Sequence, residues 1–266
     1  MVLIEDYPKD SLVSHYIDRY QFFIIENAAF LKTVPNGKIE CYFVLEGEFL
    51  RWEDESGRFA SSNKMGFLPA SNKLSFFQIP NRLICLNIKL NLNVLSLSYF
   101  SNFLTNWSSF DVVDFIDLKT QKSILTKMTK QTSAIHTEAI DQVLSQWILS
   151  QTKDEVLEKL MLQVSAHREV KISDLAAEMN MSLKTFERLI KKHFNLTPKE
   201  LLQVIRFENT TSHIKKNESQ KLIEALGFGY YDQSHFIKEC KKITGYPPKE
   251  FFSKLKLQTN DIIFES

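Results

Sequence analysis

The C-terminal third of the chain contains an internal repeat in which matching residues lie about 50 positions apart. The shift places Phe186 on Phe236, Lys191-Lys192 on Lys241-Lys242, and Pro198-Lys199-Glu200 on Pro248-Lys249-Glu250. Upstream, Ala176-x-x-x-Asn180 corresponds to Ala225-x-x-x-Gly229, with one extra residue in the second copy. Such self-similarity predicts two copies of one supersecondary unit.

Each copy is predicted to form a short helix, a turn and a second helix. A small alanine lets the two helices cross closely, and Asn180 or Gly229 tolerates a left-handed turn. Ser182 and Asp232 are candidate N-caps of the second helices. The capping box that begins at Thr197 predicts a further helix over 198–214, which joins the two copies.

The charge distribution favours an anionic partner for this part of the chain. The whole chain has a net charge of +1, which by itself points to no partner. Residues 1–120 carry 11 Lys and Arg against 14 Asp and Glu, whereas residues 153–257 carry 19 against 14. Helix-turn-helix units on a basic background are a DNA-reading shape, although a solvated charged surface has the same composition.

The second helix of each copy has an apolar face and a polar face. Phe186, Leu189 and Ile190 are predicted to face the core in the first copy, and Phe236, Cys240 and Ile243 in the second. The polar faces present side chains that pair with base edges, because Arg and Lys suit guanine, Gln suits adenine and Glu suits cytosine. The same residues are also ordinary surface residues of a helix.

Residues 153–254 resemble the DNA-binding domain of the AraC/XylS family of bacterial transcription regulators. The resemblance rests on GYYDQSHFIKECKKITGYPPKEF (229–251) and ISDLAAEMNMSLKTFERLIKKHF (172–194), in the family's order and spacing. It implies a seven-helix domain in which two recognition helices, joined by a linker helix, enter successive major grooves.

The resemblance also implies where DNA contacts lie. The helix-turn-helix motifs would span about 172–193 and 220–243, with reader helices at about 182–193 and 232–243. Base-edge positions would be Lys184, Glu187, Arg188, Gln233, Ser234 and Lys238. Residues nearer phosphates or flanking surface would be Lys191, Lys192, Lys241 and Lys242, with His235 at the DNA backbone.

Some positions on the helices have expected roles outside direct reading. Arg206 on the linker helix matches a position that is usually Arg in the family, while Ile190 and Cys240 stand where Phe is usual. These last two are expected to change core packing and not reading. His167 and His193 are expected near helix ends, where a partial positive charge is favoured.

The N-terminal half has the pattern of a sheet. Glycines at 37, 47, 57 and 66 recur at the spacing of turns between short strands. Aromatic and β-branched segments at 39–45, 48–52, 74–79 and 82–88 predict strands, which a small barrel or jelly roll would close. Residues 34–49 resemble the opening of the β-rich effector or dimerisation domains of the same family.

The pattern becomes helical from about Leu92. The stretch 136–150 is predicted as a helix, either in the core or at a dimer interface. We therefore expect an α+β chain with two domains: a cupin-like β-barrel or jelly roll (1–120), a helical connector (121–152), an all-α domain with two helix-turn-helix motifs (153–254), and a C-terminal tail (255–266).

Several other classes of protein are disfavoured. Cys41, Cys85 and Cys240 lack CxxC spacing and are expected as buried thiols, although Cys41 or Cys85 could serve as an alkyl acceptor. No metal or cofactor is expected, because His15 is the only histidine before His136. The longest uncharged stretch, 90–110, has ten Asn, Ser or Thr among its 21 residues, so neither a membrane span nor a secretory signal is expected.

These observations predict a cytoplasmic, sequence-specific transcription regulator without catalytic residues, more often an activator than a repressor in this family. The partners expected are double-stranded DNA, RNA polymerase, a small-molecule effector whose binding residues the sequence does not identify, and a second copy of the chain. Two alternatives stay open: a protein-interaction module that binds another regulator, and a β-barrel enzyme with an accessory DNA-binding domain.

Overall fold

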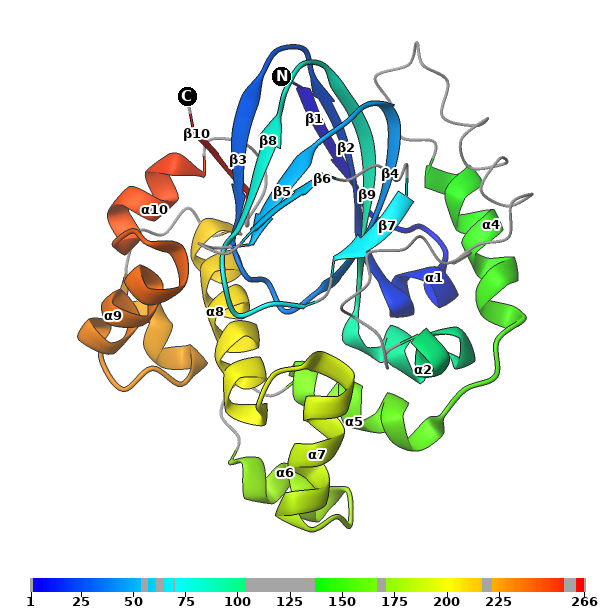
Figure 1. Ribbon diagram of the computed structural model, residues 1–266. Helices are drawn as coiled ribbons and strands as arrows, with labels where there is room; N and C mark the ends of the chain where they lie inside the picture. The colour runs from blue at the N-terminus through cyan, green and yellow to red at the C-terminus, as the bar shows by residue number, and fades with distance from the viewer. Residues whose placement is uncertain are drawn as a thin grey trace.

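The computed structural model describes residues 2–53, 57–60, 65–68, 70–103, 137–166, 171–216, 222–255 and 262–265. The N-terminal part is β-rich and the C-terminal part helical, as predicted, and the two parts pack against each other (Figure 1). The first sheet has the order β1-β2-β9-β4-β7, and the second has the order β10-β3-β8-β5-β6. Every pairing between described strands is antiparallel, so the two sheets form the expected sandwich-like barrel.

The strands are β1 (Val2–Asp6), β2 (Ile17–Ile25), β3 (Ala29–Thr33), β4 (Ile39–Gly47), β5 (Leu50–Glu53), β6 (Gly57–Ala60), β7 (Met65–Leu68), β8 (Ser75–Ile79), β9 (Leu83–Leu90) and β10 (Ile262–Glu265). The helices of the N-terminal part and the connector are α1 (Ser11–Tyr16), the 3₁₀ helix η2 (Leu92–Ser96), α2 (Ser98–Phe103) and α4 (Thr137–Leu149). Those that follow are α5 (Glu155–Ala166), α6 (Ile172–Glu178), α7 (Leu183–Phe194), α8 (Pro198–Lys216), the 3₁₀ helix η4 (Leu222–Phe228), α9 (Gln233–Thr244) and α10 (Pro248–Lys254).

The first sheet is buried on both faces. In β9 the side chains of Leu86 and Ile88 lie in the core shared with the helices, while Leu83 and Cys85 lie in the core between the two sheets. This alternation follows from the two-residue period of a strand. It gives the barrel an interior that is separate from the helical layer.

The four strands predicted from the sequence are present as β4, β5, β8 and β9. The predicted turns are correct at Gly37 and Gly47, which have φ values of 65° and 81°, but wrong at two other glycines. Gly57 begins β6 and Gly66 lies inside β7. A glycine is required in β7 because a Cβ at Gly66 would lie 2.4 Å from the Tyr42 hydroxyl.

The predicted connector helix corresponds to α4, and residues 121–136 of the connector lie outside the described residues. Ile140, Leu144 and Ile148 of α4 are buried in the same core as Val13 and Tyr16 of α1. The apolar face of α4 is therefore part of the core, which was one of the two interpretations of its sequence.

The two-copy organisation of the C-terminal part is confirmed. Asn180 and Gly229 take up the predicted left-handed conformation, with φ of 54° and 85°. The linker helix α8 begins at Pro198 as expected, after a capping box in which Thr197 N donates to Glu200 Oε2 at 2.8 Å. The short helix of the second copy is a 3₁₀ helix, η4, and not the expected counterpart of α6.

The C-terminal tail returns to the barrel. Strand β10 pairs with β3 from Ile262 opposite Thr33 to Glu265 opposite Phe30. Ile262 lies in the core between the sheets, whereas Ile263 lies with Val34 and Phe207 in the core of the second helix-turn-helix copy. Nothing in the tail sequence predicted this strand.

No helix in the described ranges is both long enough and apolar enough to cross a membrane.

Candidate nucleic-acid interface and interior pocket

Helix α7 corresponds to the predicted reader helix of the first copy. Its N-cap is Ser182, as predicted, and the side chain of that residue accepts a hydrogen bond from Thr185 N. Asn195 ends the helix in the left-handed conformation. Phe186 and Ile190 are buried and Leu189 is half-buried, so the predicted inner face is correct.

Helix α9 is built in the same way. Asp232 caps it by accepting from His235 N at 2.7 Å, and Gly245 ends it with φ of 79°. Phe236, Cys240 and Ile243 are buried, again as predicted. The cap residues explain why both reader helices begin one residue after the predicted 182 and 232.

The outer faces of both helices carry the residues expected to contact DNA. Nine of these residues are exposed, and His235 is half-buried. The exposed ones are Lys184, Glu187, Arg188, Lys191, Lys192, Gln233, Ser234, Lys238 and Lys241. His235 Nδ1 accepts from Tyr231 N at 3.4 Å, and its Nε2 lies 3.9 Å from Glu239 Oε2. The imidazole therefore faces its own domain more than the other nine side chains do.

A buried polar cluster holds α9 against α8. The Arg206 guanidinium pairs with Glu239 Oε2 at 2.5 Å and stacks on the Tyr230 ring, 4.6 Å from its centroid. Tyr230 also donates a hydrogen bond to Glu239, and Gln203 Nε2 donates to the same carboxylate at 3.0 Å. Burial and the Glu239 carboxylate raise the pKa of Tyr230, so its hydroxyl stays a donor. Arg206 was the one member that sequence comparison indicated; Glu239 was missed.

His193 lies in the last turn of α7, at a helix end as expected, but differs from the expected charge. It is 5% exposed, and burial together with the nearby Lys192 ammonium lowers its pKa to about 4. The expectation of a charge at this helix end is therefore wrong, because desolvation outweighs the helix dipole. His167 lies outside the described residues.

The two reader helices rest on different parts of the molecule. Helix α7 shares a core with the first sheet, α1 and α5, through residues such as Phe186 and Leu160. Helix α9 belongs to a second core that includes Val34 of the barrel and Ile263 of β10. Figure 1 shows α7 near the lower end of α8 and α9 to its left.

Direct contacts also join the barrel to each half. Asn72 Nδ2 donates to Glu200 Oε1 at 2.9 Å, beside the first copy. On the other side, Lys32 Nζ donates to Tyr246 Oη at 3.1 Å, just beyond α9. A Cβ on Gly37 would lie 3.1 Å from the Ile205 side chain of α8, so the barrel backbone approaches the linker helix closely. The β-rich domain thus touches both halves of the helical domain.

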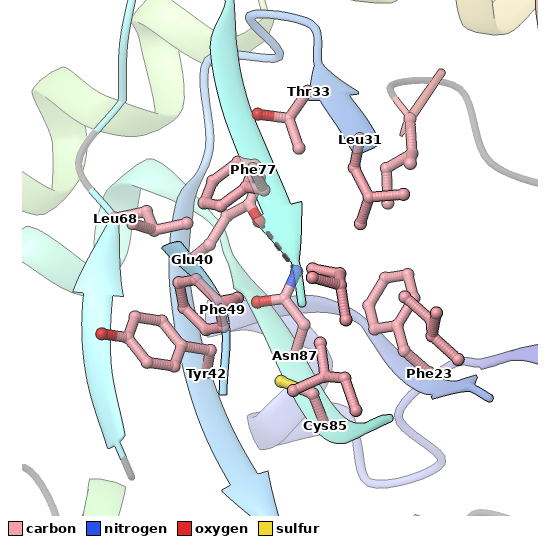
Figure 2. Close-up of a pocket in the computed structure, with 14 residues that line it drawn as sticks. Phe23, Leu31, Thr33, Glu40, Tyr42, Phe49, Leu68, Phe77, Cys85 and Asn87 are labelled. Carbon is pink, nitrogen blue, oxygen red and sulfur yellow. Dashed lines mark hydrogen bonds between the residues drawn. The ribbon is translucent and has the colours of Figure 1, made fainter. Parts of the chain in front are cut away.

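An apolar pocket lies inside the barrel, with a cavity of about 70 Å³ (Figure 2). Both sheets contribute aromatic and aliphatic walls, including Phe23, Phe49, Phe77 and Leu31. The C-terminal strand contributes Ile262. The polar residues in the lining are Thr33, Glu40, Tyr42 and Asn87. The sequence did not identify these residues as a site.

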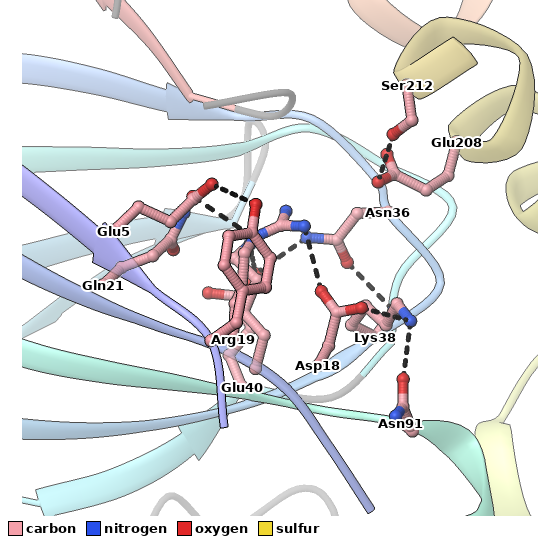
Figure 3. A network of polar contacts seen from close by, with 12 residues as sticks. Glu5, Asp18, Arg19, Gln21, Asn36, Lys38, Glu40, Asn91, Glu208 and Ser212 are labelled. Carbon is pink, nitrogen blue, oxygen red and sulfur yellow. Dashed lines mark hydrogen bonds and ion pairs between the residues drawn. The ribbon is translucent and has the colours of Figure 1, made fainter. Parts of the chain in front are cut away.

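Beyond Glu40, the interior of the barrel is occupied by paired charges (Figure 3). Lys89, which is 0% exposed, pairs with Glu40 at 2.9 Å. Arg19 pairs with Glu5 at 3.3 Å and with Asp18 at 2.9 Å, and Lys38 lies 3.2 Å from Asp18. The positive groups Lys38 and Arg19 lower the pKa of Asp18 against the effect of its burial. The interior is therefore apolar at one end and ionic at the other.

The barrel thiols are buried, as expected. Burial raises the pKa of Cys41 well above the ordinary value and that of Cys85 to about 12, which suppresses the nucleophilic thiolate. Within the described ranges, no three His, Cys, Asp or Glu side chains come together in a way that could hold a metal ion.

Comparison with known proteins agrees with this architecture. A family model described as a helix-turn-helix domain matches residues 175–254. No curated protein sequence matches the chain. A structure of ToxT from Vibrio cholerae aligns with a TM-score of 0.52 at 12% identity, covering 90% of this chain and 98% of that chain.

Two further ToxT structures from Vibrio cholerae strain SCE256 are also similar. An apo lysine-to-alanine variant aligns with a TM-score of 0.51 at 14% identity, covering 94% of this chain and 100% of that chain. Wild-type ToxT with an unsaturated fatty acid bound aligns with a TM-score of 0.49 at 13% identity, over 89% and 95% of the two chains. The C-terminal part of the chain is therefore a helix-turn-helix domain of the AraC type, and the chain as a whole has the two-domain fold of ToxT.

Proposed function

We propose that this DNA-binding transcription regulator reads two successive segments of the major groove, one with α7 and one with α9. The observation that carries the proposal is the pair of capped helices, each with a buried apolar face and an exposed polar face. Base-edge contacts come from Lys184, Glu187, Arg188, Gln233, Ser234 and Lys238. Phosphate or flanking contacts come from Lys191, Lys192, Lys241, Lys242 and His235.

The β-rich domain, which we place within residues 1–120, regulates this reading. Both halves of the helical domain contact it, so a change in the barrel alters the spacing between α7 and α9. A small molecule in the interior pocket would act by binding one arrangement more tightly than the other. In this proposal the protein works in the cytoplasm as an activator and not as an enzyme, contacts RNA polymerase, and assembles as a homodimer.

The experiment is a selection of bound duplexes from a random DNA library with the full chain at physiological salt. Two preferred blocks roughly 10 bp apart are expected, because successive major-groove segments on one DNA face are one helical turn apart. Recovery of one block would mean that one of the two helices reads the DNA sequence and the other does not. Absence of enrichment, or binding that disappears at moderate salt without sequence preference, would favour the protein-interaction alternative.

Single substitutions assign the blocks to the helices. Arg188→Ala should weaken binding to the preferred site by about 1–3 kcal/mol and relax one position of the α7 block. Lys241→Ala should weaken all sequences similarly and flatten the salt dependence. Lys159→Ala is the matched control, since this exposed lysine lies on α5 and not on a reader helix. Unchanged preference in Arg188→Ala would remove that residue from the readers.

A further inference from the structure

We propose that the interior pocket takes a small, neutral, mainly apolar molecule whose hydroxyl or N–H group donates a hydrogen bond to Asn87 Oδ1. The inference rests on the proposed role of the pocket as the effector site and names the class of effector. It depends on the hydrogen bonding of one buried side chain and on the charges around it.

The orientation of the Asn87 amide is fixed by two acceptors. Its Nδ2 donates to Glu40 Oε2 at 2.8 Å and to Gln21 Oε1 at 3.3 Å. A flipped amide would place an oxygen against the Glu40 carboxylate and the Gln21 oxygen, which is unfavourable. Figure 2 shows the amide nitrogen turned toward Glu40 and the oxygen turned to the side where Phe49 is drawn.

The amide oxygen has no hydrogen-bond partner among the described residues. Asn87 is 6% exposed and lines the pocket, so Oδ1 is a buried acceptor next to an apolar cavity. Leaving a buried acceptor unsatisfied is unfavourable, and a donor supplied by a bound molecule removes that cost. The amide therefore selects molecules that carry a donor.

Asn93 is a second buried asparagine of this kind, but it lies away from the cavity. It is also buried, its Nδ2 donates to His15 O at 2.8 Å, and its Oδ1 also lacks a partner within the described part of the chain. Asn93, however, lies in η2 on the helical side of the first sheet and does not line the pocket. Of these two asparagines, Asn87 is the one that combines an unpaired acceptor with space for a ligand.

The charges around Asn87 favour a neutral ligand. Glu40 is the one Asp, Glu, Lys or Arg side chain among the residues that line the pocket. Lys89 Nζ and Asn36 Nδ2 donate to Glu40 Oε1 at 2.9 and 3.1 Å, and Asn87 donates to Oε2. A ligand carboxylate would be repelled by the Glu40 carboxylate. A ligand ammonium would be a second buried cation beside Lys89, which is also unfavourable.

The size of the pocket restricts the apolar body. The cavity of about 70 Å³ is smaller than the roughly 150 Å³ cavity known to hold benzene, so a single ring must displace part of the wall. Ile262 is the wall residue best placed to yield, because it belongs to a short strand that, among the described strands, pairs only with β3. Small rings with one donor are therefore suitable probes.

The test measures binding of phenol, toluene and benzoate to the full chain by calorimetry, without DNA. Phenol has the donor, toluene has the same shape without it, and benzoate carries a carboxylate. In wild type, phenol should bind more tightly than benzoate. Asn87→Leu should weaken the binding of phenol relative to that of toluene about tenfold, since one hydrogen bond to phenol is removed.

Asn93→Leu is the matched control and should leave this ratio unchanged, because it makes the same substitution at a buried Asn outside the pocket. An unchanged ratio in Asn87→Leu, tighter binding of benzoate than of phenol, or no binding of phenol would each overturn the proposal. The comparison of phenol with benzoate uses wild type only, so it holds even if Asn87→Leu fails to fold. The library selection measures DNA reading separately, so failure of one proposal is distinguishable from failure of the other.

Discussion

The buried imidazole of His193 makes the first helix-turn-helix copy sensitive to acid. The ordinary pKa of about 6.5 applies to the unfolded chain, whereas burial and Lys192 lower the folded-state pKa to about 4. Between these values the unfolded state binds the proton more readily. The contribution of the neutral His193 imidazole to the free energy of unfolding is therefore complete above about pH 6.5 and is lost as the pH falls toward 4.

We expect the free energy of unfolding to fall by on the order of 2 kcal/mol across this window because of His193 alone. We expect urea unfolding of His193→Leu at a series of pH values to show a free energy of unfolding that changes less steeply with pH than that of wild type. His213→Gln is the control, because it also removes an imidazole but from an exposed position, where His213 lies 3.2 Å from Glu224. An identical slope in wild type and His193→Leu would assign the pH dependence to other groups.

At the scale of elements, the docking of α9 depends on the ion pair between Arg206 and Glu239. Glu239→Leu would leave the half-buried guanidinium without its carboxylate and Tyr230 without its acceptor. Removing one partner of a buried ion pair destabilises the folded state by more than the intact pair stabilises it, because the other charge stays buried without a partner. We expect a loss of about 2–3 kcal/mol in the free energy of unfolding, measured by urea denaturation.

Glu250→Gln provides the control for that measurement. Its carboxylate lies 3.9 Å from Lys254 Nζ at the surface, where ion pairs contribute little. A loss in Glu250→Gln equal to that in Glu239→Leu would contradict a special role for the buried cluster.

Elements with a clear period and end signals could be predicted, and others could not. The reader helices followed from their apolar faces and from Ser182 and Asp232. Polar residues at alternate positions of a strand, as in β9, normally indicate a face in contact with solvent. In this chain helices cover the apolar face of β9, and Asn87 and Lys89 on the other face point into the barrel. The pocket was missed for this reason, since its polar residues look like surface residues in the sequence. Glu239 was missed because a Glu on a basic helix has no local signal of burial.

At the scale of the whole molecule, the arrangement of the domains depends on contacts distant in sequence. The C-terminal strand lies more than 220 residues from its partner β3, and no local pattern specifies that pairing. Residues 34 and 263 meet in the core of the second copy, while the first copy shares a core with the barrel's other sheet. Sequence reasoning predicted the two domains but not the surfaces that join them.

Adjacent isoleucines in β10 separate the two roles of this strand. Ile262 is 4% exposed and faces the interior pocket, whereas Ile263 is 0% exposed and faces the helical domain. Replacing either by alanine should destabilise the chain by about 2–4 kcal/mol, because each leaves a cavity. Only Ile263→Ala weakens the contact between the barrel and the second helix-turn-helix copy.

We therefore expect calorimetric unfolding of Ile263→Ala to resolve two transitions, with the second helix-turn-helix copy unfolding apart from the barrel and the first copy, which share a core. Ile262→Ala should keep the transition pattern of wild type at a lower temperature, because the cavity it makes lies within one domain. Chains that end at residue 260 should behave as Ile263→Ala does, since they lack the whole strand. If Ile262→Ala also splits the transition, or Ile263→Ala does not, the strand is not what couples the second copy to the barrel, and regulation would have to pass through other contacts, such as that of Lys32 with Tyr246 or of Gly37 with Ile205.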